Sequence, residues 1–183
     1  VTKKDPRFVE MVLRESNEVV RTGINTLIVE HKKGFICANA GIDHSTVQGD
    51  WGDDQDWILL LPEDADASAQ KIREGLEKLF KCRLGVLIID SHGRAWRNGT
   101  VGIAIGISGM PGLVDLRGQE DLFGFKLKIT QVGAADELAA AASLVMGQAK
   151  EGTPVVHVHG FPYELRESSL KELIRDKTLD LFR

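Results

Sequence analysis

The chain has 183 residues, a formal net charge of −4 and an isoelectric point of about 5.8. This length suits a single domain, and the acidic balance argues against a nucleic-acid binder, for which a basic patch would be expected. No apolar run is long enough to span a membrane, and no signal peptide is visible. The two cysteines lie in apolar surroundings, which favours reduced, packed thiols in a cytoplasmic protein.

The first third of the chain predicts one helix followed by short strands. Residues 5–20 place apolar side chains at near-helical spacing, and Pro6 suits a first helical turn. The pattern of apolar residues and turn signals predicts strands over 26–30, 34–38 and 58–61. Between the last two strands, residues 41–56 read as a polar loop.

The middle of the chain predicts a helix and two strands. Asp64 or Asp66 can cap a helix that runs to about Phe80. Its apolar residues predict a buried face that consists of Ile72, Leu76, Leu79 and Phe80. Strands are expected over 84–90 and 101–107. In the second strand, Gly102 and Gly106 would allow another backbone to come close.

The last third mixes glycine-rich turns with one alanine-rich helix. A strand is expected over 125–132, a helix over 134–148, a strand over 154–158 and a short helix ending near Ile174. In the long helix, Asp136 and Glu137 complement the N-terminal dipole, and Gly147 lies near the end. Strands and helices do not alternate regularly, which favours an α+β fold with irregular mixed sheets and packed helices, in one domain over residues 1–183.

The segment over residues 85–99 carries the strongest functional signal. An apolar run that reads as a buried strand ends in Asp90, and a glycine-punctuated loop with Arg94 and Arg97 follows. A buried carboxylate needs a partner, and a cation or an arginine can supply it. Asp90 and Ser91 offer hard oxygen ligands that suit magnesium or manganese. The alternative is an Asp90–Arg94 ion pair that closes the loop, whereas both arginines also suit phosphate or carboxylate binding.

Other polar residues carry weaker signals. Asp43 follows small residues that would let a ligand approach, but from the spacing alone an Asx turn or helix cap is the favoured interpretation. His157 and His159 would share one face of a strand and, with His92, could form a zinc site. Two half-exposed strand histidines are the simpler interpretation. The chain contains no P-loop and no nucleophile elbow.

An ordered set of motifs resembles the coenzyme F420:glutamate ligase family. In chain order these are AGIDHS at 40–45, LLP at 60–62 before an acidic helix start, DSHGRAWRNG at 90–99, ADELAAA at 135–141 and DLFR at 180–183. The similarity covers the chain from about Thr26 onward. Its most specific part is the Asp-Ser-x-Gly-Arg-x-Trp-Arg block.

The resemblance implies an enzyme with the irregular α+β fold of the F420 gamma-glutamyl ligases, acting as a homodimer. Such an enzyme uses GTP to attach L-glutamate to the lactyl carboxylate of a deazaflavin precursor of coenzyme F420. An acyl phosphate would be the intermediate, and no residue is expected to act as a covalent nucleophile. The resemblance also implies a divalent metal, magnesium or manganese, and is compatible with a monovalent cation.

Residue roles carried over from the family are expectations of the same kind. The metal-ligand positions fall on Asp43, Asp90, Ser91 and Gln148. The nucleotide-binding positions fall on Thr46, Met146, Gly147, Gln148, Ala149, Lys150, Glu151, Gly152 and Thr153. Arg94 and Arg97 are assigned to anionic groups of the nucleotide or the substrate.

The chain departs from the family pattern in two places. Thr46 stands where members usually carry an asparagine three residues after the first metal aspartate, and it lacks the paired donor and acceptor of an amide. The family's additional N-terminal segment, which contacts the nucleotide through a lysine, is expected to be missing. The alternative function is therefore a non-catalytic nucleotide- or deazaflavin-binding homologue.

Overall fold

The computed structural model describes residues 3–44 and 57–182. The chain divides into two compact units, one made of Val1–Glu63 with Thr178–Arg183 and one made of Asp64–Lys177. Each unit combines helices with small antiparallel sheets, which confirms the predicted α+β class. Among the described helices, none has the length and apolar character needed to cross a membrane.

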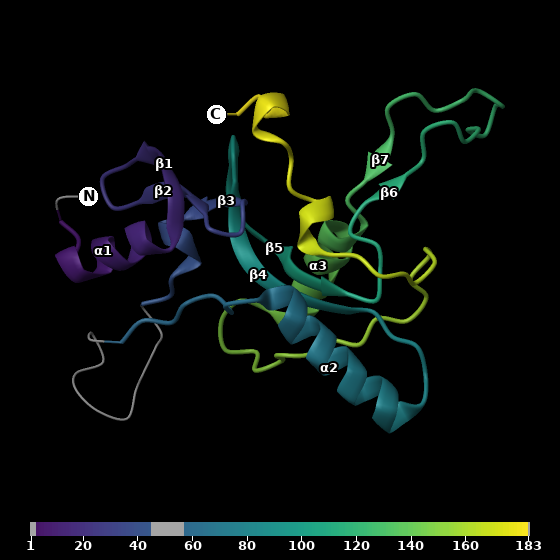
Figure 1. Ribbon diagram of the computed structural model, residues 1–183, viewed down its shortest axis with the longest axis horizontal. Coiled ribbons are helices and arrows are strands. Elements are labelled where there is room, and N and C mark those ends of the chain that lie inside the picture. Colours follow the sequence, from purple (N-terminus) through teal and green to yellow (C-terminus); the bar gives the residue numbers. More distant parts are fainter. Residues whose placement is uncertain (1–2, 45–56, 183) are drawn as a thin grey trace. The chain divides into compact units, whose positions relative to one another are not determined.

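The first unit is built on a three-stranded antiparallel sheet (Figure 1). Helix α1 (Pro6–Arg14) precedes strands β1 (Ser16–Thr22), β2 (Leu27–His31) and β3 (Ile36–Ala38), which pair in that order. The helix predicted over 5–20 is therefore wrong beyond Arg14. Its second half contains β-branched residues and pairs with β2 instead, because a ladder there satisfies the backbone groups of both strands.

The second unit is organised around one long hairpin. Strand β4 (Val86–Arg94) and strand β5 (Arg97–Ser108) pair antiparallel and are joined by a turn at Ala95 and Trp96. Helix α2 (Ala65–Phe80) begins at the N-cap Asp64, as predicted, and helix α3 (Ala134–Met146) ends at Gly147. Both helices contact β5, so the hairpin is the platform of this unit (Figure 1).

A bulge in β5 places the two helices on opposite faces of the hairpin. Ile88 pairs with Gly106, but the next residue Ile89 pairs with Ala104, so Ile105 is an extra residue. Gly102, opposite Ser91, and Gly106, opposite Ile88, therefore face opposite sides. A Cβ on Gly102 would meet the Ala139 carbonyl of α3 at 2.6 Å, and one on Gly106 would meet the Ala65 carbonyl of α2 at 2.4 Å.

These two close approaches confirm that the glycines of β5 admit another backbone. Side chains of helix α3 then accept hydrogen bonds from backbone N–H groups of the strand. Gly102 N donates to Ser143 Oγ at 3.2 Å, and Ala104 N donates to Asp136 Oδ1 at 2.9 Å. The buried cluster behind this contact consists of Ala104, Ile107, Met110 and Ala135.

Helix α2 does not bury the face that its apolar spacing predicts. Ile72 and Leu79 are 49% and 70% exposed, whereas the buried residues of the helix are Ala65 and Ala69. The approach to Gly106 explains the difference, because only small side chains fit where two backbones lie this close. The predicted buried face is therefore wrong.

A projecting arm and a long irregular segment complete the second unit. Strands β6 (Val114–Asp115) and β7 (Gln131–Val132) form the base of the arm, which replaces the strand predicted over 125–132 (Figure 1). Residues 154–158 form no strand, contrary to the prediction. The short helix expected before Ile174 is the 3-10 turn η3 (Leu170–Glu172), and a second turn, η4 (Lys177–Leu179), follows.

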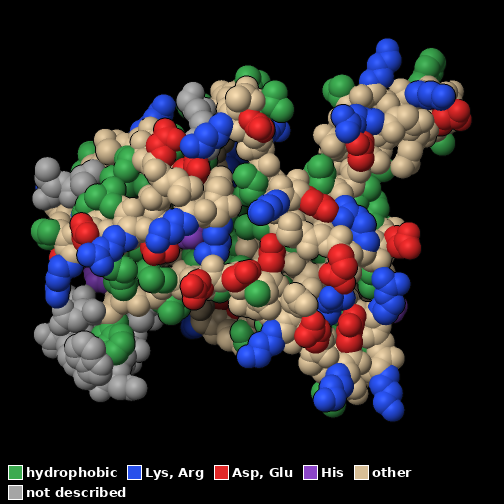
Figure 2. Space-filling view, in the orientation of Figure 1, with side chains coloured by type: hydrophobic (Ala, Val, Ile, Leu, Met, Phe, Trp, Pro, Cys, Tyr) green, Lys and Arg blue, Asp and Glu red, His purple; other side chains and the backbone are tan. Residues whose placement is uncertain are grey.

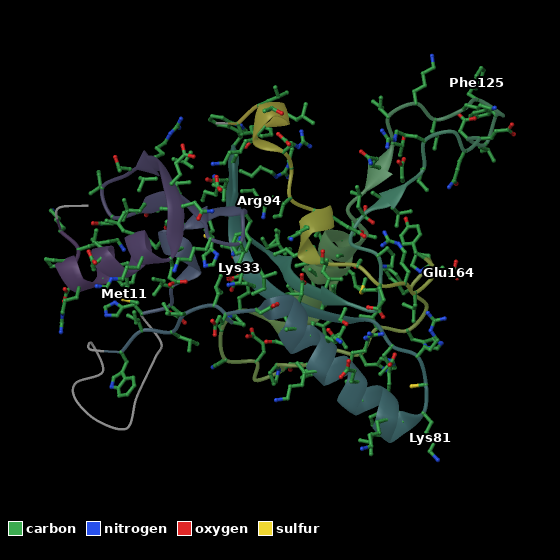
Figure 3. All side chains as sticks on the ribbon, in the orientation of Figure 1. Met11, Lys33, Lys81, Arg94, Phe125 and Glu164 are labelled. Carbon is green, nitrogen blue, oxygen red and sulfur yellow. The ribbon has the colours of Figure 1, made fainter. Side chains whose placement is uncertain are left out.

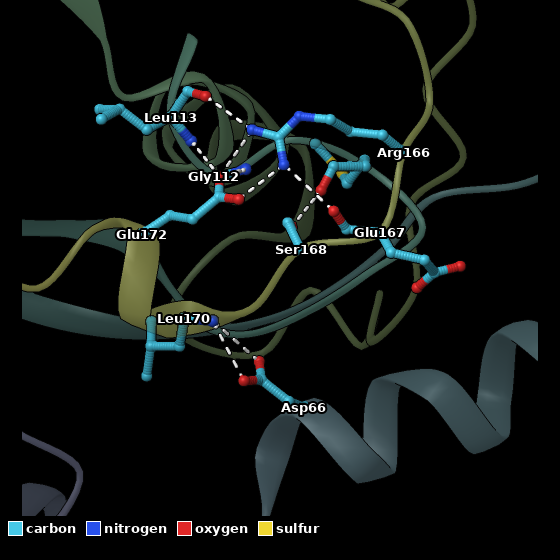
Figure 4. A network of polar contacts seen from close by, with 9 residues as sticks. Asp66, Gly112, Leu113, Arg166, Glu167, Ser168, Leu170 and Glu172 are labelled. Atoms are coloured by element: carbon cyan, nitrogen blue, oxygen red, sulfur yellow. Dashed lines mark hydrogen bonds and ion pairs between the residues drawn. The ribbon is translucent and has the colours of Figure 1, made fainter. Parts of the chain in front are cut away.

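A polar network fastens this C-terminal segment to the hairpin and to α2 (Figure 4). The Glu172 carboxylate accepts from the backbone N–H groups of Gly112 and Leu113 at 3.1 Å and ion-pairs with Arg166 at 2.6 Å. Hydrogen bonding to the Arg166 guanidinium holds the pKa of Glu172 below its usual value. The Asp66 carboxylate accepts from Ile107 N at 2.7 Å and from Leu170 N at 3.1 Å.

Candidate functional site

Asp90 lies within strand β4 rather than at its end. The strand continues for four residues beyond it, to Arg94, and the sheet is an antiparallel pair. The prediction that the strand ends at Asp90 and that a loop follows is therefore wrong. Alternation along β4 instead sends Asp90, His92 and Arg94 to one face, which we call the Asp90 face, and Ser91 to the other, which we call the Ser91 face.

On the Asp90 face, the carboxylate is held by a buried histidine. His92 is 7% exposed, and its Nε2 lies 2.9 Å from Asp90 Oδ2. Asp90 makes this ion pair and none with Arg94, so the predicted alternative, an Asp90–Arg94 pair, is wrong. His92 lies on the same face as Asp90 because residues two positions apart along a strand share a face. In a loop, as predicted here, the partner of Asp90 would not have been determined by such alternation.

The two arginines of the hairpin lie directly opposite each other. Arg94 pairs with Arg97 across the turn, which places both side chains on the Asp90 face. Like charges in such a pair repel. The Arg94 Nη1 atom is buried without a hydrogen-bond partner, and Nη2 reaches only the Asn98 carbonyl at 3.4 Å. Figure 3 labels Arg94 at this end of β4. An oxyanion between the two guanidinium groups would relieve both the repulsion and the unsatisfied donor.

The Ser91 face carries a second set of oxygen atoms. Thr100 pairs with Gly93, two residues after Ser91, so Thr100 and Ser91 face the same side as α3. The Thr100 hydroxyl donates to Gln148 Oε1 at 2.5 Å, although 48 residues separate the two in sequence. The structure therefore brings Ser91, Thr100 and Gln148 to one face of the hairpin and leaves Asp90 on the other.

The segment over 146–153 forms a tight turn after α3. Met146 is the last helical residue, and Gly147 follows with a φ of 73°. Ala149 N donates to Glu151 Oε2 at 2.8 Å, and this bond holds the pKa of Glu151 below its usual value. The Glu151 carboxylate folds over Gly147, where an added Cβ would lie 2.2 Å from its Cδ. The turn thus already binds an anionic group through a backbone N–H.

In the first unit, Asp43 follows an unusual left-handed turn. Asn39, Ala40 and Gly41 have φ values of 50°, 55° and 65°, a conformation that costs energy in residues other than glycine and is concentrated at functional sites. The Asp43 backbone is then fixed by two bonds with Leu59, from Asp43 N at 3.0 Å and from Leu59 N at 2.8 Å.

An open cavity of about 410 Å³ lies beside this turn. It is lined by basic, acidic, aromatic and amide side chains, namely Lys3, Lys4, Asp5, Phe8, Asn39, Ile42, Asp43 and His44. Asp43 is exposed and lines this cavity, so it does not belong to the core. Thr46 lies outside the described residues.

The oxygen donors present suit a hard divalent cation. A carboxylate, a hydroxyl and an amide oxygen, as on Asp90, Ser91 and Gln148, are ligands that magnesium and manganese prefer. Within the described residues there is no group of three or more His, Cys, Asp and Glu side chains that could hold a metal. His157 and His159 are exposed and lie outside any strand, with ring centroids 6.4 Å apart. The cysteines form no disulfide in the described chain; Cys37 is buried and Cys82 is exposed.

Sequence reasoning missed three of the groups around these positions. Thr100 and His92 contact predicted site residues, and Lys4 lines the cavity of Asp43. If the strand had been predicted to continue through Arg94, the alternation of side chains along it would have placed His92 beside Asp90, because residues two apart share a face. No local signal connects Thr100 to Gln148, or places Lys4 and Asp43 at one cavity, because both arrangements depend on tertiary packing.

Comparison with known proteins identifies the family. Residues 1–160 match the family described as F420-0:Gamma-glutamyl ligase. The chain is 49% identical over 98% of its length to the coenzyme F420:L-glutamate ligase of Methanococcus maripaludis. The corresponding identities are 47% over the whole chain for the ligase of Methanocaldococcus jannaschii and 42% over 98% for that of Archaeoglobus fulgidus. The chain spans about 70% of the length of these relatives. Together, the motif order and this similarity establish that the chain belongs to the F420-0:gamma-glutamyl ligase family.

Proposed function

We propose that this chain is a GTP-dependent ligase that adds L-glutamate to the deazaflavin precursor of coenzyme F420 through an acyl phosphate. The relatives named coenzyme F420:L-glutamate ligase support the two substrates. The observation that carries the reaction type is the facing pair Arg94 and Arg97, on the same face as Asp90. Two opposed guanidinium groups beside a carboxylate suit a reaction in which anionic oxygens are brought together.

The proposed chemistry has two steps that balance without a protein nucleophile. First, a carboxylate oxygen of the precursor attacks the γ-phosphorus of GTP, the bond to the β-phosphate oxygen breaks, and GDP leaves. Next, the glutamate amine attacks the carbonyl carbon, a C–N bond forms, the C–O bond to phosphate breaks, and the amine loses its proton. Phosphoryl transfer of this kind depends mainly on positioning and charge neutralisation.

The residues of the hairpin take defined roles in this proposal. Arg94 and Arg97 hold anionic oxygens of the nucleotide or the substrate. Ser91 and Gln148, which share one face of the hairpin, would supply oxygen ligands to one magnesium or manganese ion, with Thr100 fixing the Gln148 carbonyl. Asp90, on the other face, would supply an oxygen ligand to a second ion. A divalent ion bound there would neutralise charge on the transferred phosphoryl group.

The remaining roles rest on the family resemblance together with local geometry. Asp43 would be a further metal ligand, and the strained turn before it supports a functional role. The turn over 146–153 would contact the nucleotide. Its Ala149 N–H, already bonded to the Glu151 carboxylate, is a donor that suits an anion.

We also propose that the enzyme acts as a homodimer. The tip of the arm between β6 and β7 exposes three large apolar side chains, Leu122 at 93%, Phe123 at 80% and Phe125 at 72%. Figure 3 labels Phe125 at the tip, and Figure 2 shows apolar side chains there among charged ones. Clustered apolar surface of this kind marks interaction sites, and a second copy of the chain is the partner that the family resemblance implies.

Replacing Asp90 tests the ligase proposal. Asp90→Asn keeps the size of the side chain but removes its charge, so we expect loss of glutamate-dependent GTP hydrolysis by more than about 100-fold, as for removal of one electrostatic contact in a polar site. Circular dichroism should show an unchanged fold. Asp115→Asn is the matched control, because Asp115 lies on the arm, where Arg117 pairs with it.

Two outcomes would count against the proposal. Full activity in Asp90→Asn would exclude the role of the hairpin. A wild-type protein that binds GTP but forms no glutamylated product would favour the alternative of a non-catalytic nucleotide- or deazaflavin-binding homologue.

A further inference from the structure

The cavity beside Asp43 contains two lysines that no role described above uses. Lys3 and Lys4 line it together with Asp43 and the aromatic rings of Phe8 and His44. The contacts in the first unit indicate what these lysines are available to bind.

Three basic residues of this unit are neutralised by carboxylates. Arg7 pairs with Asp5 at 2.8 Å, Arg14 with Glu10 at 2.9 Å and Lys32 with Glu15 at 3.1 Å. Lys3 and Lys4 form no such pair with any described residue. The carboxylate of Asp5, the acidic residue next to them, already accepts hydrogen bonds from the side chain and the backbone N–H of Arg7. The cavity therefore holds two cationic groups without carboxylate partners.

Lys4 is also held in position before any ligand arrives. Its Nζ lies 4.4 Å from the centroid of the Phe8 ring, a cation–π contact. Phe8 is 8% exposed, and its ring contacts that of His44 at a centroid distance of 5.5 Å. Because the ring that carries the ammonium is anchored in the core, less side-chain entropy is lost when Lys4 binds a ligand. Figure 2 shows basic and histidine side chains gathered over α1 in this region.

The lining of the cavity also includes a polar donor and a carboxylate. Asn39 Oδ1 accepts from Leu27 N at 3.1 Å, which leaves its amide N–H groups as the donors on that side chain. Asp43 lines the same cavity and contributes a negative charge to it. A ligand that fits these charges carries oxyanions toward the lysines and a cationic group, or a bound cation, toward Asp43.

We propose that Lys3 and Lys4 form an oxyanion-binding subsite beside Asp43 that holds a carboxylate or phosphate group of a substrate. This subsite rests on the proposed ligase function for the identity of its ligand. The two sources are L-glutamate, whose ammonium would face Asp43 and whose carboxylates would face the lysines, and the phosphates of the nucleotide with a divalent ion on Asp43.

Direct binding tests the subsite without any turnover. Calorimetric titration of the whole chain with L-glutamate, and separately with inorganic triphosphate and magnesium, gives one dissociation constant for each probe. The variants are Lys4→Gln and Lys3→Gln, which remove one charge at similar length, and Lys4→Arg, which keeps it. The matched control is Lys71→Gln, because Lys71 is exposed on α2 in the other unit.

We expect Lys4→Gln to weaken binding of at least one probe by tenfold or more, with Lys4→Arg within threefold of wild type. Weaker binding of L-glutamate alone would identify a carboxylate subsite, and weaker binding of triphosphate alone would identify a phosphate subsite. The proposal is overturned if both lysine variants bind both probes within twofold of Lys71→Gln, or if wild type binds neither. Because no product is measured, a failed glutamylation assay would reject the ligase function while leaving this result standing.

Discussion

The contact between Gly106 and α2 allows a quantitative prediction about the hairpin platform. In Gly106→Ala, the new Cβ would lie 2.4 Å from the carbonyl oxygen and 2.5 Å from the carbonyl carbon of Ala65. An ordinary contact begins at 3.4 Å, so the start of α2 must move by about 1 Å. Because both atoms belong to backbone, no side-chain rotation can relieve the clash.

The cost follows from what this movement disturbs. Overpacking in a filled interior costs about 1–3 kcal/mol. The neighbouring Asp66 carboxylate also holds Ile107 N at 2.7 Å and Leu170 N at 3.1 Å, and weakening one such charge-assisted bond adds about 1–2 kcal/mol. We therefore expect Gly106→Ala to lower the free energy of unfolding by about 2–5 kcal/mol, a fall in Tm of about 4–20 °C for a chain of this length.

Two other glycines provide matched controls for urea and thermal unfolding followed by circular dichroism. A Cβ on Gly93, in the same hairpin, meets no atom within 4 Å, so Gly93→Ala should change stability by less than about 0.5 kcal/mol. Gly75 lies inside α2 with the same open surroundings, and Gly75→Ala should stabilise by about 0.5–1 kcal/mol. Combining Gly106→Ala with Asp66→Asn should cost less than the sum of the two. A Tm for Gly106→Ala within 2 °C of that for Gly93→Ala would refute the argument.

Three further predictions concern other contacts of the described chain. Glu172→Gln should lower stability at pH 7 by about 1.5–3 kcal/mol. The pKa of Glu172 is lowered in the folded state by Arg166, so its contribution is present above its unfolded pKa of about 4.5 and is lost as the pH falls through the folded value. Urea midpoints of variant and wild type should converge as the pH falls below the folded pKa of Glu172, and a constant difference at all pH values would contradict this. Thr100→Val should leave Tm unchanged but weaken Mn²⁺ binding by about 10-fold, because Gln148 loses the hydroxyl that orients its side chain. Electron paramagnetic resonance measures this affinity. An unchanged affinity would show that Gln148 is not a ligand of the metal. Phe123→Ser with Phe125→Ser should leave Tm unchanged, since both side chains are exposed, and should shift sedimentation from dimer to monomer; a persistent dimer would exclude the arm as the interface.

Local patterns were sufficient where one segment settles its own structure. Helix α2 begins at its cap Asp64 because that side chain accepts from Ala67 N at 2.8 Å, three residues along. The alanine-rich helix α3 ends at Gly147, and the two strands of the hairpin appear close to where the apolar runs predicted them. The family resemblance likewise depended on residues close together in sequence and was confirmed over almost the whole chain.

Predictions failed where distant segments decide the outcome. Residues from Ser16 onward have helical spacing but form β1, because β2 offers backbone hydrogen-bond partners along this segment, with two interruptions of register. The apolar stripe of α2 is exposed, because the helix approaches Gly106 through Ala65 instead. Asp90 was expected to end its strand, and its partner could not be identified until the strand was seen to continue through His92.

By itself, the sequence determined which segments are helical or extended where caps, glycines and apolar runs act over a few residues, and it identified the oxygen-rich residues of the family motif. Only the tertiary structure decided which face each of these residues occupies. One bulge in β5 sets α2 and α3 on opposite sides of the hairpin, and alternation along β4 puts Asp90 and Ser91 on opposite faces. Packing across 48 residues joins Thr100 to Gln148. The physical reason is that caps and turns are satisfied within a few residues, whereas register and packing depend on partners that lie far along the chain.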